Sequence, residues 1–384
     1  MDLLRIPGSR IVEISRLALA TPDVDFLCFG ESDQPSPVSA HEAAMAALAA
    51  GQTKYPDVRG LPALRTGLAA YLSELHANPV SETRVQITAS GMTAMNVALA
   101  AIVRAGQRVV LHEPGWPNIA NAALVRGAQL DPIELIALAG GHFRLDLDRL
   151  DSMLVNARVF VLNSPNNPTG WTASLSELQA ILEICRRRGV WLIADEVYSR
   201  LVYDGSAAAP SLLDIASPDD RVIVINSFSK TWVMTGWRLG WMVLPEGTRD
   251  GITEIVETTH SGVAPFIQQA GVAAIADTAV VTAFRAHCAR GRQLAGEALA
   301  GLNGIHYADP DGAFYAFVGV EGLRDSLSLA RRLVTEHGVA VAPGVAFGAS
   351  GEGFLRVCFA QSPQRLERAM GRLREGLRQE MASR

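Results

Sequence analysis

The segment that decides the fold class reads Asn226-Ser227-Phe228-Ser229-Lys230-Thr231-Trp232-Val233-Met234-Thr235-Gly236-Trp237-Arg238-Leu239-Gly240, a hydroxyl-rich turn between two apolar runs. Lysine is almost absent from the chain: of 34 basic residues only Lys54 and Lys230 are lysines, which leaves 32 arginines. Arginine would serve for charge alone, but a guanidinium stays protonated and is not a nucleophile. An amine that must lose its proton and attack a carbonyl has to be lysine. Lys230 is therefore a candidate nucleophile, although a codon bias toward arginine would leave the same two lysines.

Length, charge and cysteine content exclude several classes of protein. The 384 residues are enough for two domains. The net charge of −5 and scattered basic residues argue against a nucleic-acid binder. No apolar run reaches the length of a membrane span, and the first residues lack the pattern of a signal peptide. The four cysteines are widely spaced, at Cys28, Cys185, Cys288 and Cys358. They show neither the spacing of metal ligands nor the density of a disulfide-rich protein, so we expect reduced thiols, no metal site and a cytoplasmic protein.

Strand and helix patterns alternate through most of the chain. The first forty residues are predicted to be irregular, because prolines and glycines interrupt them. Short apolar strands are predicted at residues 84–88, 108–111, 157–162, 190–194 and 221–225, and helices at 40–50, 61–76, 93–103 and 175–188. Such strands between amphipathic helices indicate a mostly parallel sheet covered on both faces. After about residue 285, helices around strands near 312–318 and 354–360 predict a smaller α+β domain.

Polar clusters follow the predicted strands at the points where they end. These clusters are Ser90-Gly91 and residues 163–170, 195–198 and 227–230. Ligands of open parallel sheets bind beyond the carboxyl ends of the strands, so we expect the clusters to meet at one crevice. Asp195-Glu196 also resembles the magnesium-binding strand of a nucleotide hydrolase, but the chain has no Gly-x-x-x-x-Gly-Lys-Ser/Thr phosphate loop.

Seven segments in order carry a resemblance to a known family: Tyr55-Pro56-Asp57-Val58-Arg59-Gly60, Ser90-Gly91, Pro114-Gly115-Trp116, Asn167-Pro168-Thr169-Gly170, Asp195-Glu196-Val197-Tyr198, residues 230–238, and Phe354-Leu355-Arg356. Together they resemble the fold-type I pyridoxal-phosphate enzymes, specifically the class I and II aminotransferases. The resemblance implies an α/β fold, with a three-layer large domain, a mostly parallel mixed sheet and a smaller α+β domain. It implies an N-terminal segment at 1–38 that packs with the small domain, a large cofactor-binding domain at 39–284 and a C-terminal small domain at 285–384.

The resemblance assigns the chemistry of a bound pyridoxal 5′-phosphate to a few positions. Lys230 matches the lysine that holds the cofactor as an internal aldimine and moves the proton between Cα and C4′. Asp195 matches the carboxylate that keeps the pyridine nitrogen protonated, so that the ring acts as an electron sink. Tyr198 and Asn167 match the residues that hydrogen-bond the 3′-oxygen. Glu196 is then expected to be structural.

Other matched positions would hold the cofactor phosphate. Ser227 and Arg238 match the family's phosphate ligands, and Arg238 is able to engage two oxygens at once. Ser229 is a further member of this set. Gly91 and Met92 are expected to open a helix whose free N–H groups face the same phosphate.

The remaining matches concern ring stacking, substrate and the oligomer. Trp116 stands where relatives stack an aromatic side chain on the cofactor ring. Arg356, a charge inside an apolar strand, resembles the arginine that binds the substrate α-carboxylate, and Gly30 resembles the glycine beside the same group. A buried ion pair is the alternative for Arg356. Tyr55 matches the tyrosine that reaches the cofactor phosphate across a homodimer interface.

The expected function is transamination between an L-amino acid and a 2-oxo acid such as 2-oxoglutarate or pyruvate. Met92, Ile119 and residues 257–263 are candidates to border the side-chain pocket, and none supplies the arginine or lysine of a dedicated dicarboxylate site. An aromatic, aliphatic or neutral donor is therefore favoured over aspartate. A pyridoxal-phosphate carbon–sulfur β-lyase shares the same motifs and stays an alternative. A regulator with an aminotransferase-like domain would need a DNA-binding module, for which forty irregular, non-basic residues leave no room.

Overall fold

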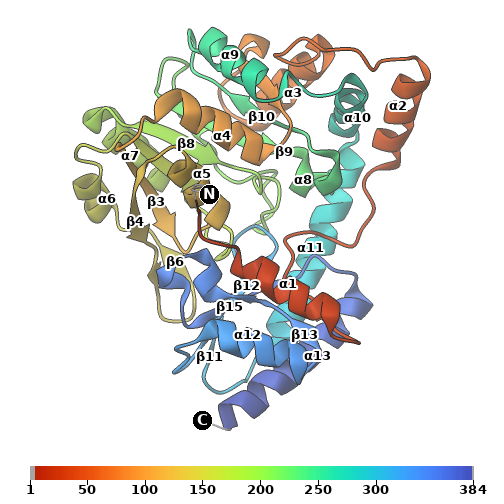
Figure 1. Ribbon diagram of the computed structural model, residues 1–384, viewed down its shortest axis with the longest axis vertical. Helices are drawn as coiled ribbons and strands as arrows, with labels where there is room; N and C mark the ends of the chain where they lie inside the picture. Colours follow the sequence, from red (N-terminus) through yellow and green to blue (C-terminus); the bar gives the residue numbers. More distant parts are fainter. Residues whose placement is uncertain (1–4, 383–384) are drawn as a thin grey trace.

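The computed structural model describes residues 5–382, and a seven-stranded sheet lies at its centre (Figure 1). In spatial order its strands are β2 (Val85–Thr88), β10 (Gly240–Val243), β9 (Val222–Ser227), β8 (Trp191–Asp195), β7 (Val159–Asn163), β3 (Arg108–Glu113) and β4 (Gln129–Glu134). Only β10 runs antiparallel to its neighbours, and the other pairs are parallel. The predicted mostly parallel mixed sheet is confirmed.

Helices cover both faces of this sheet because its central strands are apolar on both sides. In β7, Val159 and Val161 belong to one core, while Phe160 and Leu162 belong to the other. The first core contains side chains of α4 (Gly91–Ile102), α5 (Pro117–Val125) and α9 (Arg249–His260). The second contains side chains of α2 (Val38–Ala49), α3 (Pro62–Leu75), α6 (Leu147–Met153), α7 (Leu175–Arg188) and α10 (Pro265–Ala276). The result is a three-layer arrangement (Figure 1).

The carboxyl ends of the three central strands lie side by side. Asn163, the last residue of β7, pairs with Asp195, the last residue of β8. Asp195 in turn pairs with Ile225 of β9, two residues before that strand ends at Ser227. The polar clusters that follow these strands are therefore brought to one edge of the sheet, as the sequence predicted.

A second, antiparallel sheet is built from the last part of the chain. Its strands are β11 (Ile305–His306), β12 (Tyr315–Val320), β15 (Phe354–Cys358) and β14 (Ala342–Pro343), in that order. The helices of this region are α11 (Thr278–Leu299), α12 (Ser326–Thr335) and α13 (Pro363–Ala382). A two-stranded ribbon, β5 (Ile136–Ala137) with β6 (Phe143–Arg144), reaches it from the large sheet, since Phe143 contacts Phe317 and Phe354.

The N-terminal region contains a helix, α1 (Arg10–Ala20), so the prediction of an irregular start was wrong. Pro7 and Pro22 leave room for three turns between them, the Ser9 side chain accepts a hydrogen bond from Val12 N, and one face of the helix is buried. After it, β1 (Asp25–Phe26) pairs in parallel with β13 (Val339–Ala340). In Figure 1 the red α1 lies against the blue elements of the small sheet, consistent with its contacts to α12 and β14.

The division at 1–38, 39–284 and 285–384 stays a prediction, and residues 1–4 and 383–384 lie outside the described part of the chain. Its second boundary falls inside the continuous helix α11, which runs from the large sheet to the small one (Figure 1). Within residues 5–382 no single helix is long and apolar enough to cross a membrane. Only α10 and α11 taken together pass that test on length and composition, across a bend of 75°.

Candidate active site

A cavity of about 450 Å³ opens at the carboxyl ends of β7, β8 and β9. Of the thirteen positions predicted from the sequence, eleven line it: Gly30, Gly91, Met92, Trp116, Asn167, Asp195, Tyr198, Ser227, Ser229, Lys230 and Arg238. Arg356 lies directly behind the wall, and Tyr55 lies elsewhere on the surface. The groups therefore come from segments far apart in the sequence, as convergence at a sheet edge requires.

Lys230 lies on the short helix α8 (Phe228–Thr231), which begins directly after β9. The Ser227 hydroxyl starts this helix by accepting a hydrogen bond from Ser229 N at 3.1 Å. The Lys230 amine points into the cavity and donates to the Gly30 carbonyl oxygen at 2.6 Å. Desolvation by the surrounding protein lowers the pKa of Lys230 to about 8, so the neutral amine is accessible near physiological pH.

Asp195 is buried where β8 ends, and its Oδ1 accepts a hydrogen bond from Val197 N at 3.3 Å. Burial raises the pKa of Asp195 to about 6. No arginine, lysine or histidine within residues 5–382 forms an ion pair with this carboxylate. A cationic ligand group beside it would favour the ionised form and lower that pKa again.

The neighbouring carboxylate of Glu196 is held away from the cavity. Its oxygens accept hydrogen bonds from the Ser211 hydroxyl at 2.6 Å and from Leu212 N at 3.0 Å. Burial raises the pKa of Glu196 to about 7. Of the two adjacent acids, Asp195 thus lines the cavity and Glu196 points into the core, which agrees with the expectation that Glu196 is structural.

One end of the cavity is suited to an anion. Helix α4 begins at Gly91, and the Ser90 hydroxyl caps it by accepting from Thr93 N at 3.0 Å. Free N–H groups of this first turn face the cavity together with Ser227 and the guanidinium of Arg238. Arg238 donates to the Thr235 carbonyl at 2.6 Å and forms no ion pair within the described residues. Hydroxyl, backbone and guanidinium donors at one place fit a phosphate group.

Arg356 lies in the middle of β15 and is only 1% exposed. Its Nη1 donates to Asn167 Oδ1 at 3.1 Å and its Nη2 to the Cys28 carbonyl at 2.5 Å, while Nε has no partner. No carboxylate in residues 5–382 pairs with it, which argues against the alternative of a buried structural ion pair. A buried guanidinium that lacks a counter-charge is costly, so an anionic ligand beside Asn167 would stabilise it.

Tyr55 is 91% exposed in the loop between α2 and α3 and does not reach the cavity of its own chain. Its predicted position across a dimer interface stays a prediction. Among the candidates for the side-chain pocket, Met92 lines the cavity, whereas Ile119 and residues 257–263 do not line it in the single chain. Ile119, on α5, instead packs in the core that α4, α5 and α9 form against the sheet.

Sequence reasoning missed Tyr315, which lines the cavity from β12. The Tyr315 and Tyr198 hydroxyls lie 2.7 Å apart and share a hydrogen bond. The sequence carried no usable signal for Tyr315, because it stands inside the apolar run Phe314-Tyr315-Ala316-Phe317, where an aromatic residue reads as core. Phe29 was missed as a lining residue for the same reason, whereas Asn163 belongs to the polar cluster at 163–170 that was expected at the crevice, although it was not singled out within that cluster.

Comparison with known proteins decides the family. The family model for aminotransferases of class I and II matches residues 24–373. This chain belongs to that family. The aminotransferase is 31% identical to an aspartate aminotransferase from Thermotoga maritima over 97% of each chain. It is also 31% identical to the arginine–pyruvate transaminase of Pseudomonas aeruginosa, over 91% of this chain and 89% of that protein.

Solved structures agree with this assignment. An aminotransferase from Mycobacterium tuberculosis matches with a TM-score of 0.91 and 31% identity, covering 98% of this chain and 99% of the other. The Thermotoga maritima aspartate aminotransferase matches with a TM-score of 0.88 and 31% identity, covering 96% and 97%. The fold-type I assignment is confirmed, and the protein is an aminotransferase that transfers an amino group between an amino acid and a 2-oxo acid.

This family depends on pyridoxal phosphate, and the groups in the cavity fit that molecule. Arg238 and the start of α4 offer an anion site. Asp195 offers a carboxylate that forms no ion pair within the described residues, which suits a protonated ring nitrogen. Lys230 offers a readily deprotonated amine on the same cavity wall.

Proposed function

We propose that this aminotransferase binds pyridoxal 5′-phosphate in the cavity, held covalently by Lys230. The observation that carries the proposal is that Lys230, one of two lysines in the chain, shares a cavity with Asp195, a buried carboxylate that forms no ion pair in contact within residues 5–382. An amine with a pKa of about 8 is able to form a covalent bond to an aldehyde near neutral pH.

Cofactor binding is assigned to groups on three sides of the cavity. Ser227, Ser229, Arg238 and the first N–H groups of α4, at Gly91 and Met92, would hold the phosphate. The indole of Trp116 would stack on the ring, and Tyr198 and Asn167 would hydrogen-bond its 3′-oxygen. Each of these groups lines the same cavity, which supports their joint assignment.

Two residues would share the catalytic work: Asp195, a carboxylate that stays ionised, and Lys230, an amine that accepts and returns a proton. When bound, the cofactor supplies an electron-withdrawing ring that stabilises negative charge at the substrate Cα. The Asp195 carboxylate would hold a proton on the ring nitrogen. The Lys230 amine would take the proton from the substrate Cα and return it, as a general base with a pKa near the working pH does efficiently.

Substrate binding is assigned to Arg356, Asn167 and Gly30. The Arg356 guanidinium already contacts Asn167, and its free Nε leaves donor capacity for the α-carboxylate of an amino acid or 2-oxo acid. A side chain at position 30 would crowd this region, since a Cβ there would lie 2.5 Å from the Tyr315 hydroxyl. 2-Oxoglutarate and pyruvate are the acceptors to test first.

A reduction experiment tests the proposal. The purified protein with cofactor is expected to be yellow, and borohydride is expected to remove that absorption and fix a pyridoxyl label on Lys230. A label on Lys54, or on no residue, contradicts the assignment. A panel of amino donors with 2-oxoglutarate then identifies the substrate. Formation of pyruvate and thiol from cystathionine, without formation of glutamate, would favour a carbon–sulfur β-lyase instead.

We also propose a homodimer with shared sites, in which Tyr55 of each subunit approaches the phosphate of its neighbour. Tyr55 is 91% exposed, and the nearby helix α2 exposes Val38, Met45 and Leu48. Mixing inactive Tyr55 and Lys230 variants is expected to restore part of the activity, because a hybrid dimer regains one intact site. A fully active monomer in sedimentation would contradict this. The four free, buried cysteines support a cytoplasmic location.

A further inference from the structure

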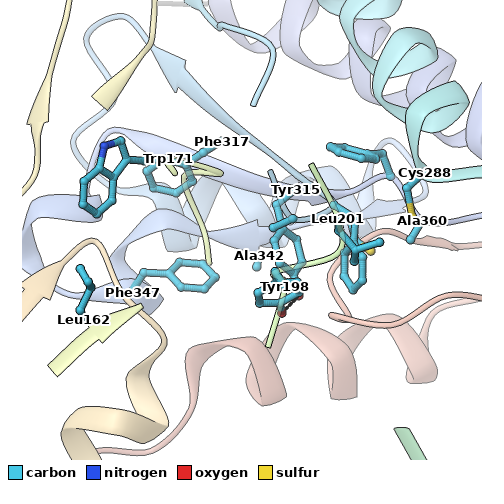
Figure 2. Close-up of a cluster of buried hydrophobic side chains, with 14 of the residues drawn as sticks. Leu162, Trp171, Tyr198, Leu201, Cys288, Tyr315, Phe317, Ala342, Phe347 and Ala360 are labelled. Atoms are coloured by element: carbon cyan, nitrogen blue, oxygen red, sulfur yellow. Dashed lines mark hydrogen bonds between the residues drawn. The ribbon is translucent and has the colours of Figure 1, made fainter. Parts of the chain in front are cut away.

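Tyr315 lies between three groups of the site. It is fully buried on β12, and its hydroxyl lies 2.7 Å from that of Tyr198. The same hydroxyl lies so close to Gly30 that a Cβ there would be 2.5 Å away. On the ring face, Cζ of Arg356 lies 4.5 Å from the Tyr315 centroid. Figure 2 shows Tyr198 and Tyr315 side by side in the buried cluster, with Phe347 to one side.

The two hydroxyls have one shared hydrogen bond and two protons. Within residues 5–382 each hydroxyl has only the other as its hydrogen-bond partner. Burial raises the pKa of Tyr198 and of Tyr315 well above the ordinary tyrosine value, so both keep their protons. One proton fills the shared bond, and the other is free to be donated elsewhere. If Tyr315 donates, the free proton belongs to Tyr198.

The ring of Tyr315 is one of two that hold Arg356. Its centroid lies 4.5 Å from the guanidinium carbon, and that of Phe347 lies 4.9 Å from it. Two hydrogen bonds, to Asn167 and to the Cys28 carbonyl, fix the guanidinium as well. Aromatic faces attract a cation without using its N–H donors. Arg356 is thus held in place while Nε keeps its donor capacity.

We propose that Tyr315 is a positioning residue for both Tyr198 and Arg356. Its hydroxyl donates to Tyr198, which directs the Tyr198 proton to the 3′-oxygen of the cofactor. Its ring holds the Arg356 guanidinium ready for the substrate carboxylate. This inference rests on the proposed function, because it takes Tyr198 and Arg356 to face cofactor and substrate.

Tyr315→Phe tests the hydroxyl, because it keeps the ring. Without donation from Tyr315, Tyr198 becomes a weaker donor, and the deprotonated form of the bound cofactor loses stabilisation. The pH midpoint of the cofactor absorption is expected to rise by a few tenths to about one unit, with KM changed less than about twofold. An unchanged midpoint, or a lower one, overturns the hydroxyl role. In a Tyr198→Phe background the substitution is expected to cause no further shift, and a persisting shift also overturns it.

Tyr315→Leu and Phe347→Leu test the ring. Each removes one face that holds Arg356, so KM for every amino acid and 2-oxo acid is expected to rise about tenfold, with a smaller change in kcat. Only Tyr315→Leu is expected to move the absorption midpoint as well. Unchanged KM values in folded Phe347→Leu and Tyr315→Leu proteins overturn the ring role, and Tyr315→Phe still decides the hydroxyl role if either fails to fold.

Tyr203→Phe is the matched control, since Tyr203 is a neighbouring tyrosine whose hydroxyl donates to the Ala313 carbonyl and which does not line the cavity. It is expected to leave the midpoint and KM unchanged, and a shift equal to that of Tyr315→Phe would overturn the specificity of the effect. The absorption spectrum of the wild type separates a failure of the proposed function from a failure of the inference on Tyr315. A wild type without lysine-bound cofactor absorption refutes the proposed function, whereas a normal wild type and an identical Tyr315→Phe refute only this inference.

Discussion

The large sheet and the small sheet supply different kinds of group to the cavity. The large sheet supplies groups at strand ends, such as Asp195 at the end of β8 and Lys230 three residues after β9. The small sheet supplies Tyr315, which is the first residue of β12 and lines the cavity, and Arg356, which lies in the middle of β15 directly behind the cavity wall. Both are packed among aromatic rings. These groups at or just beyond strand ends line the cavity, and burial shifts their pKa values toward neutrality. Arg356, inside β15, is held by the rings of Tyr315 and Phe347, which suits the recognition of a fixed charge. Proton transfer and substrate anchoring are therefore assigned to different sheets.

The largest effect is expected at the large sheet, from Lys230→Arg. Arginine keeps the charge and most of the volume but cannot bond covalently to the cofactor or accept a proton from Cα. Turnover is expected to fall by at least about 10⁴-fold, with an unchanged circular dichroism spectrum and melting temperature. Lys54→Arg is the matched control, since Lys54 is exposed and outside the cavity, and it should keep its activity. Measurable turnover by Lys230→Arg would place the chemistry elsewhere.

The next effect is expected from Asp195→Asn, which keeps size but removes charge. The ring nitrogen of the cofactor would then lose its proton, and negative charge at Cα would be stabilised less well. Cofactor binding is expected to persist, while single-turnover rates fall by several powers of ten. An N-methylated cofactor should recover part of the rate. Glutamate at this position should retain more activity than asparagine, and the opposite order would count against the role of Asp195.

At the small sheet, Arg356→Leu is expected to change substrate binding rather than chemistry. All substrates share the α-carboxylate, so KM should rise for each by a similar factor, equivalent to about 2–4 kcal/mol. Steady-state kinetics with several donors and acceptors measure this. Arg378→Leu, which removes an exposed partner of Glu375 on α13, is the control and should leave KM unchanged. If both variants behave like the wild type, Arg356 has only a structural role.

The smallest effect on activity is expected from Glu196→Gln, beside Asp195 but outside the cavity. Burial raises the pKa of Glu196 from 4.5 to about 7, with Ser211, Leu212, His76 and Asp214 around it. Between pH 4.5 and 7 Glu196 is mostly ionised in the unfolded chain but still mostly protonated in the folded chain. The folded chain therefore binds more protons in this range, and the free energy of unfolding falls as the pH rises. Relative to Glu196→Gln, wild-type unfolding free energy should decline by on the order of 2–3 kcal/mol from pH 4.5 to 7, measured by urea titration. Parallel pH curves for the two proteins would contradict this.

Groups at strand ends were predictable from the sequence because they interrupt apolar runs. Lys230, Asp195 and Asn167 each stand in a polar cluster directly after a buried strand. Arg356 was predictable for a different reason, since a charge in an apolar strand is costly without a partner. Tyr315 gave no such signal, because a tyrosine among phenylalanines is compatible with an ordinary core.

Several elements of the fold escaped prediction, and for α1 and β4 the reasons are local. Helix α1 is short and bracketed by prolines, and its stability depends on packing against the small sheet rather than on its own sequence. Strand β4 contains Asp131 and Pro132, which are unfavourable in a central strand, but it lies at the edge of the sheet. In both elements tertiary contacts decide the conformation, and these contacts cannot be seen in a window of a few residues.

The scarcity of lysine gives this enzyme a practical property. Its two lysine amines lie in different environments, with Lys230 inside the cavity and Lys54 on an exposed loop. An amine-selective reagent therefore meets one lysine side chain in the active site and one outside it. With Lys54→Arg, the fluorophore attached to the one remaining side-chain amine, located by peptide mapping, would report on active-site occupancy, and bound cofactor would protect that amine. A single substitution thus leaves one reactive lysine, whose rate of labelling measures how freely ligands enter the active site.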